Sequence, residues 1–163
     1  MALTAAPNSR VINISGPSGN GKRTLAHKAI DKRPDTFTLA VSHTSTRSPR
    51  AGERQLYGTS KASIVGAAMN GLVVMLNIEP NGGQQIQAEP SVDACYIFIK
   101  PPSLDALGAR LRSCGTESDA DVQRRLARAC VGLEIAGKWG SYDKPIVNDD
   151  LEMAYRELEE FAL

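Results

Sequence analysis

A glycine-rich segment near the start of the chain has the spacing of a loop that binds phosphate. Residues 14–30 read ISGPSGNGKRTLAHKAI, in which Gly16, Gly21 and Lys22 follow the Walker A pattern. In that pattern backbone N–H groups surround phosphate oxygens, the lysine reaches the outer phosphates, and a Ser or Thr hydroxyl binds Mg²⁺. Arg23 occupies the hydroxyl position here. The sequence therefore predicts an anion-binding loop with an altered metal position, a degenerate Walker A motif.

The arginine at position 23 changes what the loop can bind. Arginine has five N–H donors and no acceptor, so Arg23 cannot replace a metal-binding hydroxyl. Thr24 follows, but on a helix its side chain lies about 100° further around the axis. Either Arg23 points to solvent and a metal ligand is missing, or its guanidinium lies on the phosphates and supplies positive charge directly. A chance glycine-rich turn is less favoured, because a strand and a helix flank the loop as the motif requires.

The elements around this loop alternate between strands and helices. Strands are predicted at residues 10–15, 36–42, 72–78, 94–100 and 144–148, and helices at 21–33, 59–71, 102–114, 117–138 and 150–163. Residues 43–55 are polar and predict a loop, and Thr59 or Ser60 is expected to cap the helix that follows. Continuous apolar runs such as 72–78 are typical of buried parallel strands. The pattern predicts an α/β fold, with a parallel sheet covered by helices on both faces.

Bulk composition narrows the classes of protein. The chain has 163 residues with 42% hydrophobic and 23% charged residues and a net charge of +1, which predicts one domain over 1–163 and no nucleic-acid partner recruited by bulk charge. No apolar run is long enough for a membrane span or a signal peptide. The three cysteines, Cys95, Cys114 and Cys130, lack metal-ligand spacing. They are expected to be reduced thiols that pack in a cytoplasmic protein, and no metal ligands are assigned.

Several further blocks resemble guanylate kinase, a family that transfers the γ-phosphoryl group of ATP to GMP. They are ISGPSGNGK, VSHTSTRSPRAGE, YGTSKAS, YIFIKPPSLDAL and YDKPIVNDDLEMAYRELEEF, and they occur in family order. The resemblance implies a P-loop nucleoside-monophosphate-kinase fold. It places the core at about 10–56 and 72–163, a shortened remnant of the GMP-binding region at about 42–60, and a lid at about 112–128.

The resemblance also implies site residues, position by position. Nucleotide and phosphate binding falls to Gly16, Ser18, Gly19, Gly21, Lys22, Arg23, Thr24 and Asn148, the last beside the adenine site. The remnant of the GMP site comprises Ser42, Arg47, Arg50, Tyr57, Thr59 and Glu79. Lys22 and Arg125 resemble catalytic cations, with Arg23 in an altered role. The block SHTSTR is one residue longer than the family spacing, which leaves the alignment of Ser42 open, and a solvated loop is the alternative for Arg47 and Arg50.

Three departures from the family pattern concern its catalytic parts. Only RQL separates PRAGE from YGTS, where the family has most of its GMP-binding subdomain, including an acidic residue that reads guanine and a tyrosine that grips the GMP phosphate. The family's LDID is LNIE, so Asn77 replaces an aspartate and Glu79 carries its carboxylate on a longer arm. Cys114 replaces a lid arginine. Because phosphoryl transfer depends on positioning and charge neutralisation, GMP kinase activity is predicted to be low or absent.

These departures favour a protein repurposed to bind a nucleotide, phosphate or another small ligand in an opened cleft. ATP is a candidate ligand, and Arg23 argues against the usual Mg²⁺. One form of this hypothesis is an interaction module that binds phosphorylated protein partners through Arg47 and Arg50. Another is a new enzyme, with the candidate acid–base or nucleophilic groups His43, Cys114, Glu79 and Lys22. The alternative is an active but reduced nucleoside-monophosphate kinase, so the sequence leaves open whether the chain is an enzyme.

Overall fold

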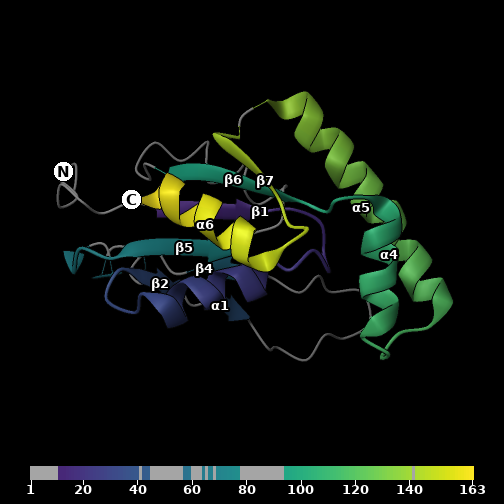
Figure 1. The fold of residues 1–163 in the computed structure, drawn as a ribbon, viewed down its shortest axis with the longest axis horizontal. Coiled ribbons are helices and arrows are strands. Elements are labelled where there is room, and N and C mark those ends of the chain that lie inside the picture. The colour runs from purple at the N-terminus through teal and green to yellow at the C-terminus, as the bar shows by residue number, and fades with distance from the viewer. Residues whose placement is uncertain are drawn as a thin grey trace.

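A five-stranded parallel sheet forms the centre of the computed structural model, in the order β2-β5-β1-β6-β7 (Figure 1). The structure describes residues 11–40, 42–44, 57–59, 64, 66–67, 69–77, 94–140 and 142–163. The strands are β1 Val11–Ser15, β2 Phe37–Leu39, β5 Val73–Asn77, β6 Ala94–Lys100 and β7 Lys144–Val147. The helices are α1 Lys22–Lys32, α4 Leu104–Ser113, α5 Asp119–Trp139 and α6 Leu151–Ala162. The predicted α/β fold is confirmed.

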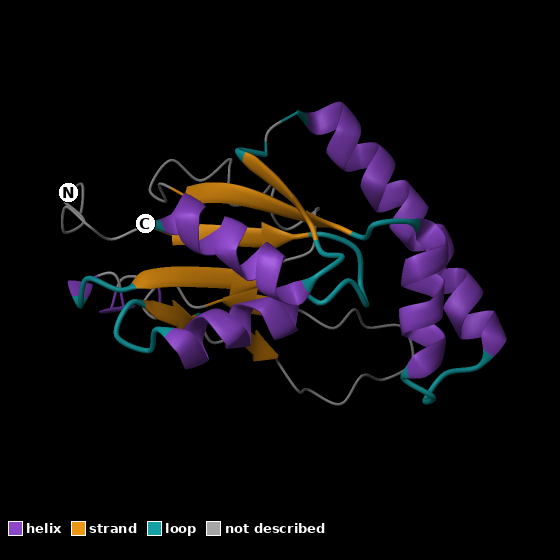
Figure 2. Cartoon of the chain, in the orientation of Figure 1, coloured by secondary structure: helices purple, strands orange, loops and turns teal. Residues whose placement is uncertain are grey.

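Strand β1 is buried on both faces of the sheet, with Ile12 and Ile14 on one side and Val11, Asn13 and Ser15 on the other. Ile12 and Ile14 face a core that α1 and α6 close, and Figure 2 shows these two helices on the same side of the sheet. Val11 belongs to a second cluster, against which Ile64 and Ala67 of a helical stretch pack. The alternation follows from the two-residue period of a strand. The central strand is thereby buried on both faces, and the loop that follows it starts from a fixed position.

Helices α4 and α5 form a hairpin beyond the carboxyl end of β6 (Figure 1). The hairpin has its own apolar cluster, which comprises Leu107, Leu111, Val122 and Ala129 with Leu126 beside them. Serine caps set where each helix begins, because Ser103 Oγ accepts from Ala106 N at 3.0 Å and Ser118 Oγ accepts from Asp121 N at 3.3 Å. None of the helices in the described ranges is long and apolar enough to cross a membrane.

Two predictions near residue 42 are wrong. The strand predicted over 36–42 ends at Leu39, and Ser42–Thr44 forms a separate strand, β3. This strand pairs antiparallel with β4, Tyr57–Thr59, in a second sheet. His43 therefore lies in a strand rather than a loop, and Thr59 does not cap a helix. The two segments form strands because they hydrogen-bond to each other. They are more than ten residues apart in the sequence, so local residue preferences do not reveal this pairing.

The cysteines also depart in part from expectation. Within the described part of the chain the three cysteines form no disulfide with one another, and only Cys95 and Cys130 are partly buried. Cys114 is exposed at the carboxyl end of α4, so the prediction that the cysteines pack is wrong at this position. A helix end that faces solvent offers a thiol no apolar surface to pack against.

Candidate phosphate-binding site

The glycine loop joins β1 to α1 and is pressed between several distant elements. Gly19 and Gly21 have φ angles of 82° and 83°, a region that strains any residue with a Cβ. A methyl group at Gly19 would overlap Leu111 of α4, and one at Gly21 would lie 2.5 Å from Asn148 Nδ2. Glycine is therefore required at both positions by conformation and by space. The outer edge stays open, since Ser18 and Gly19 are exposed.

The lysine of the motif lies over the loop that precedes it. Lys22 Nζ donates to the carbonyl oxygens of Gly16 and Pro17, each at 2.7 Å. Helix α1 begins at the same residue, with Gly21 as its cap and no acidic side chain in its first turn. The positive end of the helix dipole is thus not offset by a carboxylate of its own first turn, and it adds to the charge of the ammonium group. This arrangement suits an anion such as a phosphate group.

Two buried asparagines attach the loop to its surroundings. Asn20 is fully buried, and its Nδ2 donates to the carbonyl oxygen of Ile99 at the end of β6. Asn148 is 5% exposed, and its Nδ2 donates to the carbonyl oxygen of Asn20 at 2.9 Å. Asn148 was expected beside an adenine site, and its side chain touches the loop backbone. Asn20 was missed, although an asparagine inside a glycine loop is a signal for a side chain that bonds backbone.

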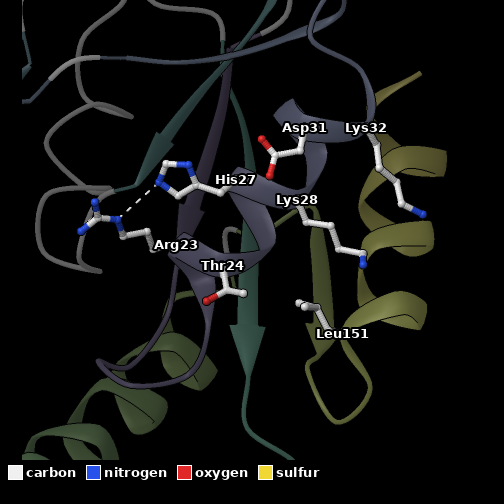
Figure 3. Close-up of a pocket in the computed structure, with 7 residues that line it drawn as sticks. All are labelled: Arg23, Thr24, His27, Lys28, Asp31, Lys32 and Leu151. Carbon is white, nitrogen blue, oxygen red and sulfur yellow. Dashed lines mark hydrogen bonds between the residues drawn. The ribbon is translucent and has the colours of Figure 1, made fainter. Parts of the chain in front are cut away.

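Arg23 and Thr24 are both exposed on α1 (Figure 3). Arg23 Nε donates to His27 Nε2 at 3.4 Å, one turn further along the helix. Figure 3 shows the guanidinium directed away from Thr24, at one end of a cavity of about 600 Å³ along α1. The cavity is lined by Arg23, Thr24, His27, Lys28, Asp31, Lys32 and Leu151. Of the two interpretations of Arg23, this geometry matches a side chain that faces outward.

The described residues around the loop offer donors that suit phosphate groups. The loop offers N–H donors and an ammonium group, whereas Arg23 has no oxygen to give a cation. Asn77 is exposed at the end of β5, and Glu79 lies outside the described residues. Across the described part of the chain, no three His, Cys, Asp or Glu side chains gather where they could hold a metal ion.

Arg125, the predicted lid arginine, is engaged with a carboxylate. Its NH2 nitrogen lies 2.6 Å from Glu117 Oε1, at the turn between α4 and α5. Nearby, the pKa of Asp121 is held below its ordinary value, first by a hydrogen bond from Ser118 and then by one from Arg124. These contacts lie within the α4–α5 hairpin. Arg125 would have to leave Glu117 before it could contact a phosphate group.

The predicted acceptor residues are only partly described. The pairing of β3 with β4 puts Ser42 opposite Thr59 and Thr44 opposite Tyr57, so three of the predicted positions share one hairpin. Arg47, Arg50 and Glu79 lie outside the described residues. Arg110 of α4 was not predicted as a site residue, yet its NH2 nitrogen donates to the carbonyl oxygen of Asn148 at 2.7 Å. No sequence signal separated it from Arg112, the other arginine of the same helix.

Comparisons with known proteins place the sequence beside guanylate kinases. The family model for guanylate kinase matches residues 8–55 and 51–162. A guanylate kinase of Schizosaccharomyces pombe is 36% identical over 180 positions, covering 92% of this chain and 88% of its own. A guanylate kinase of Sus scrofa is 34% identical, with coverages of 93% and 90%. The alignment of 180 positions is longer than the 163-residue chain, and the two family matches overlap at residues 51–55.

Solved structures show the same fold at low sequence identity. The crystal structure of guanylate kinase from Anaplasma phagocytophilum superposes with a TM-score of 0.66 at 20% identity, covering 96% of this chain and 86% of that chain. The SH3-kinase fragment of tight junction protein 3 gives a TM-score of 0.64 at 17% identity, covering 97% of this chain and 58% of that chain. The fold therefore matches both a kinase and a fragment that also carries an SH3 part.

Proposed function

Because this chain belongs to the guanylate kinase family, we propose that it binds nucleotide phosphates at its glycine loop, while ordinary transfer from ATP to GMP is weak or lost. One observation carries the proposal: Lys22 and the glycine backbone form an anion cradle, but the next residue, Arg23, turns along α1 to His27. The part of the site that holds phosphate is thus supported by the geometry. The part that holds the metal lacks its hydroxyl.

ATP is the candidate ligand for this cradle. The backbone N–H groups of 16–22 and the start of α1 would receive its phosphates, with Lys22 on the outer ones. Bound ATP supplies the phosphoryl group for any transfer. When phosphate binds, the Lys22 ammonium group has to leave the carbonyl oxygens of Gly16 and Pro17. Its new hydrogen bonds are stronger, because phosphate oxygens are charged and carbonyl oxygens are neutral.

Phosphoryl transfer asks for more than a phosphate cradle. It needs the nucleophile in line and the developing charge neutralised by metal and arginine groups. In this chain Arg23 replaces the metal-binding hydroxyl, Cys114 replaces a lid arginine, and RQL replaces most of the acceptor subdomain. One arginine contact of this kind is worth roughly 10³ in rate. The three changes together support the proposal that GMP kinase activity is low.

The test combines binding and turnover. Calorimetry with a non-hydrolysable ATP analogue should show binding to the native chain and a loss of about tenfold or more in Lys22→Ala, the value of a charge-assisted hydrogen bond. Lys28→Ala is the matched control, since Lys28 lies on the same helix and pairs with Glu152 at 2.8 Å. ADP formation from ATP and GMP, with and without Mg²⁺, is measured beside Arg23→Ser.

The outcomes separate the alternatives. Little ADP from either protein, with analogue binding that depends on Lys22, supports the proposal and places the defect beyond Arg23. Robust turnover that depends on Mg²⁺ in the native chain would instead establish a reduced but working nucleoside-monophosphate kinase. Analogue binding unchanged in Lys22→Ala would remove the glycine loop as the ligand site.

An interaction module is the second candidate, favoured by the fold likeness to the tight junction protein 3 fragment. In this reading Arg47 and Arg50 bind a phosphorylated partner. A phosphopeptide screen with the native chain and an Arg47→Ala, Arg50→Ala variant tests it. Binding that needs the phosphate and both arginines would support the module, and an empty screen would leave the nucleotide as the candidate ligand.

A further inference from the structure

Arg110 joins helix α4 to the turn between β7 and α6. The residue is half-buried, and its NH2 nitrogen donates to the carbonyl oxygens of Asn148 at 2.7 Å and Asp149 at 3.5 Å. The partners are backbone atoms, so this contact fixes where the turn lies rather than the conformation of a flexible side chain. A cationic donor makes such a bond about twice as strong as a neutral one.

The turn in contact with Arg110 is also the support of the glycine loop. The Asn148 backbone N–H donates to the carbonyl oxygen of Lys100 at 2.9 Å, while its Nδ2 donates to that of Asn20 at the same distance. The proximity of Asn148 Nδ2 to Gly21 leaves little room for either group to shift. A displacement of Asn148 would therefore change the path of residues 20 and 21.

Helix α4 reaches the loop by a second contact one residue away. Leu111 is 3% exposed, and its side chain fills the space where a Cβ of Gly19 would lie. Leu111 also belongs to the apolar cluster that holds α4 against α5. Arg110 and Leu111 thus bracket the loop, one through Asn148 and one by direct packing, and both move with the hairpin.

We propose that Arg110 is a positioning residue that holds the glycine loop in its anion-binding shape through Asn148 and couples the loop to the α4–α5 hairpin. The inference deepens the proposed function, because its test by nucleotide affinity rests on that function. Phosphate binding depends on several backbone N–H groups that point to one place, so a small shift of residues 19–21 weakens many contacts together.

The first arm of the test uses no nucleotide. Hydrogen exchange of peptides covering residues 16–25 is compared with that of peptides covering β6, in the native chain, Arg110→Ala and Arg110→Lys. Loop amides should exchange about tenfold faster in Arg110→Ala, relative to β6, and Arg110→Lys should fall between, because its ammonium group can still donate to one carbonyl. Arg112→Ala is the control, since Arg112 is exposed on the same helix and lies 3.9 Å from Asp119.

The second arm measures affinity for the ATP analogue. Arg110→Ala should weaken it about tenfold, with partial rescue in Arg110→Lys and no change in Arg112→Ala. In an Asn148→Ala background the effect of Arg110→Ala on both readouts should largely vanish, because the link to the loop is already cut. Full additivity of the two substitutions would overturn the route through Asn148.

The two proposals fail differently. If the native chain binds no analogue while loop exchange still depends on Arg110, the proposed function falls and the positioning role stands. If loop and β6 amides change equally in Arg110→Ala, the role is overturned and Arg110 is a general stabiliser. Should Arg110→Ala not fold, Arg110→Lys and Arg110→Gln carry the same comparison, and unchanged loop exchange in both overturns the inference.

Discussion

The glycine loop and the acceptor hairpin are held in different ways. The loop receives contacts from β6, α4 and the turn before α6, through Asn20, Leu111 and Asn148. The acceptor hairpin, β3 with β4, is a separate sheet whose register runs over three residue pairs. Neither β3 nor β4 pairs with a strand of the five-stranded sheet. A change in β3 or β4 is therefore expected to leave the pairing of the main sheet intact, whereas a change in the glycine loop disturbs several elements.

Guanine specificity is where the comparison predicts the largest effect. A site that hydrogen-bonds a base can reject the wrong one by about 10⁴. Only three residues separate Glu53 from Tyr57, where the resemblance predicts that the residues that read guanine are missing. GMP and AMP should therefore bind with affinities within about tenfold of each other. Competition calorimetry with the two nucleotides checks this. A preference for GMP of a thousandfold would mean that the acceptor side has rebuilt a guanine site.

Gly21→Ala should damage the loop side. The alanine Cβ would meet Asn148 at a φ of 83°, and residues held in that region cost about 1–3 kcal/mol. Urea unfolding should show a loss of this size, together with weaker binding of the ATP analogue. Gly132→Ala is the matched control, because a Cβ there meets nothing within 4 Å and the residue lies in α5. It should stabilise by about 0.5–1 kcal/mol, and a loss at Gly132 instead would invalidate the contrast.

Asn13→Val sharpens the comparison within β1. Asn13 is fully buried, as Asn20 is, but neither of its side-chain amide atoms is hydrogen-bonded within the described structure. The side chains of Asn20 and Asn148 each donate to a backbone carbonyl oxygen. Leaving a buried amide without a partner costs about 1–3 kcal/mol. Replacement by valine should raise the free energy of unfolding by about 1 kcal/mol in a urea titration and leave nucleotide affinity unchanged. A decrease in stability would mean that the amide has a polar partner in solution.

The smallest predicted effect is on the stability of the fold at acidic pH. Lys28 and then Lys32 hydrogen-bond Glu152 and lower its pKa to about 2, which joins α1 to α6. A carboxylate with a lowered pKa stabilises the fold above its unfolded value of 4.5 and loses this contribution as the pH falls from there towards 2. Glu152→Gln should flatten that part of a stability–pH curve slightly, since the pair is partly exposed. An identical curve would show that the bridge adds nothing.

Local signals in the sequence predicted the parts of the fold that local geometry governs. Gly16, Gly21 and Lys22 identified the loop, and the alternation of apolar runs with helical periods indicated the parallel sheet. The resemblance supplied the family. The local pattern failed at residues 36–44, because residue preferences do not show where one strand ends and a strand of another sheet begins. It also failed at Cys114, because the exposure of a side chain at a helix end depends on what surrounds that end.

The sequence by itself determined a glycine loop with Walker A spacing between a strand and a helix, because those features depend on the order and spacing of neighbouring residues. The tertiary structure alone decided what holds the loop. Asn20 and Ile99 are 79 positions apart and Asn148 and Asn20 are 128 apart, so their pairing, and the contact of Arg110 with the same turn, arise only when the sheet brings strand ends together. The direction of Arg23 is by contrast a local feature, since its partner His27 lies four residues further along the same helix.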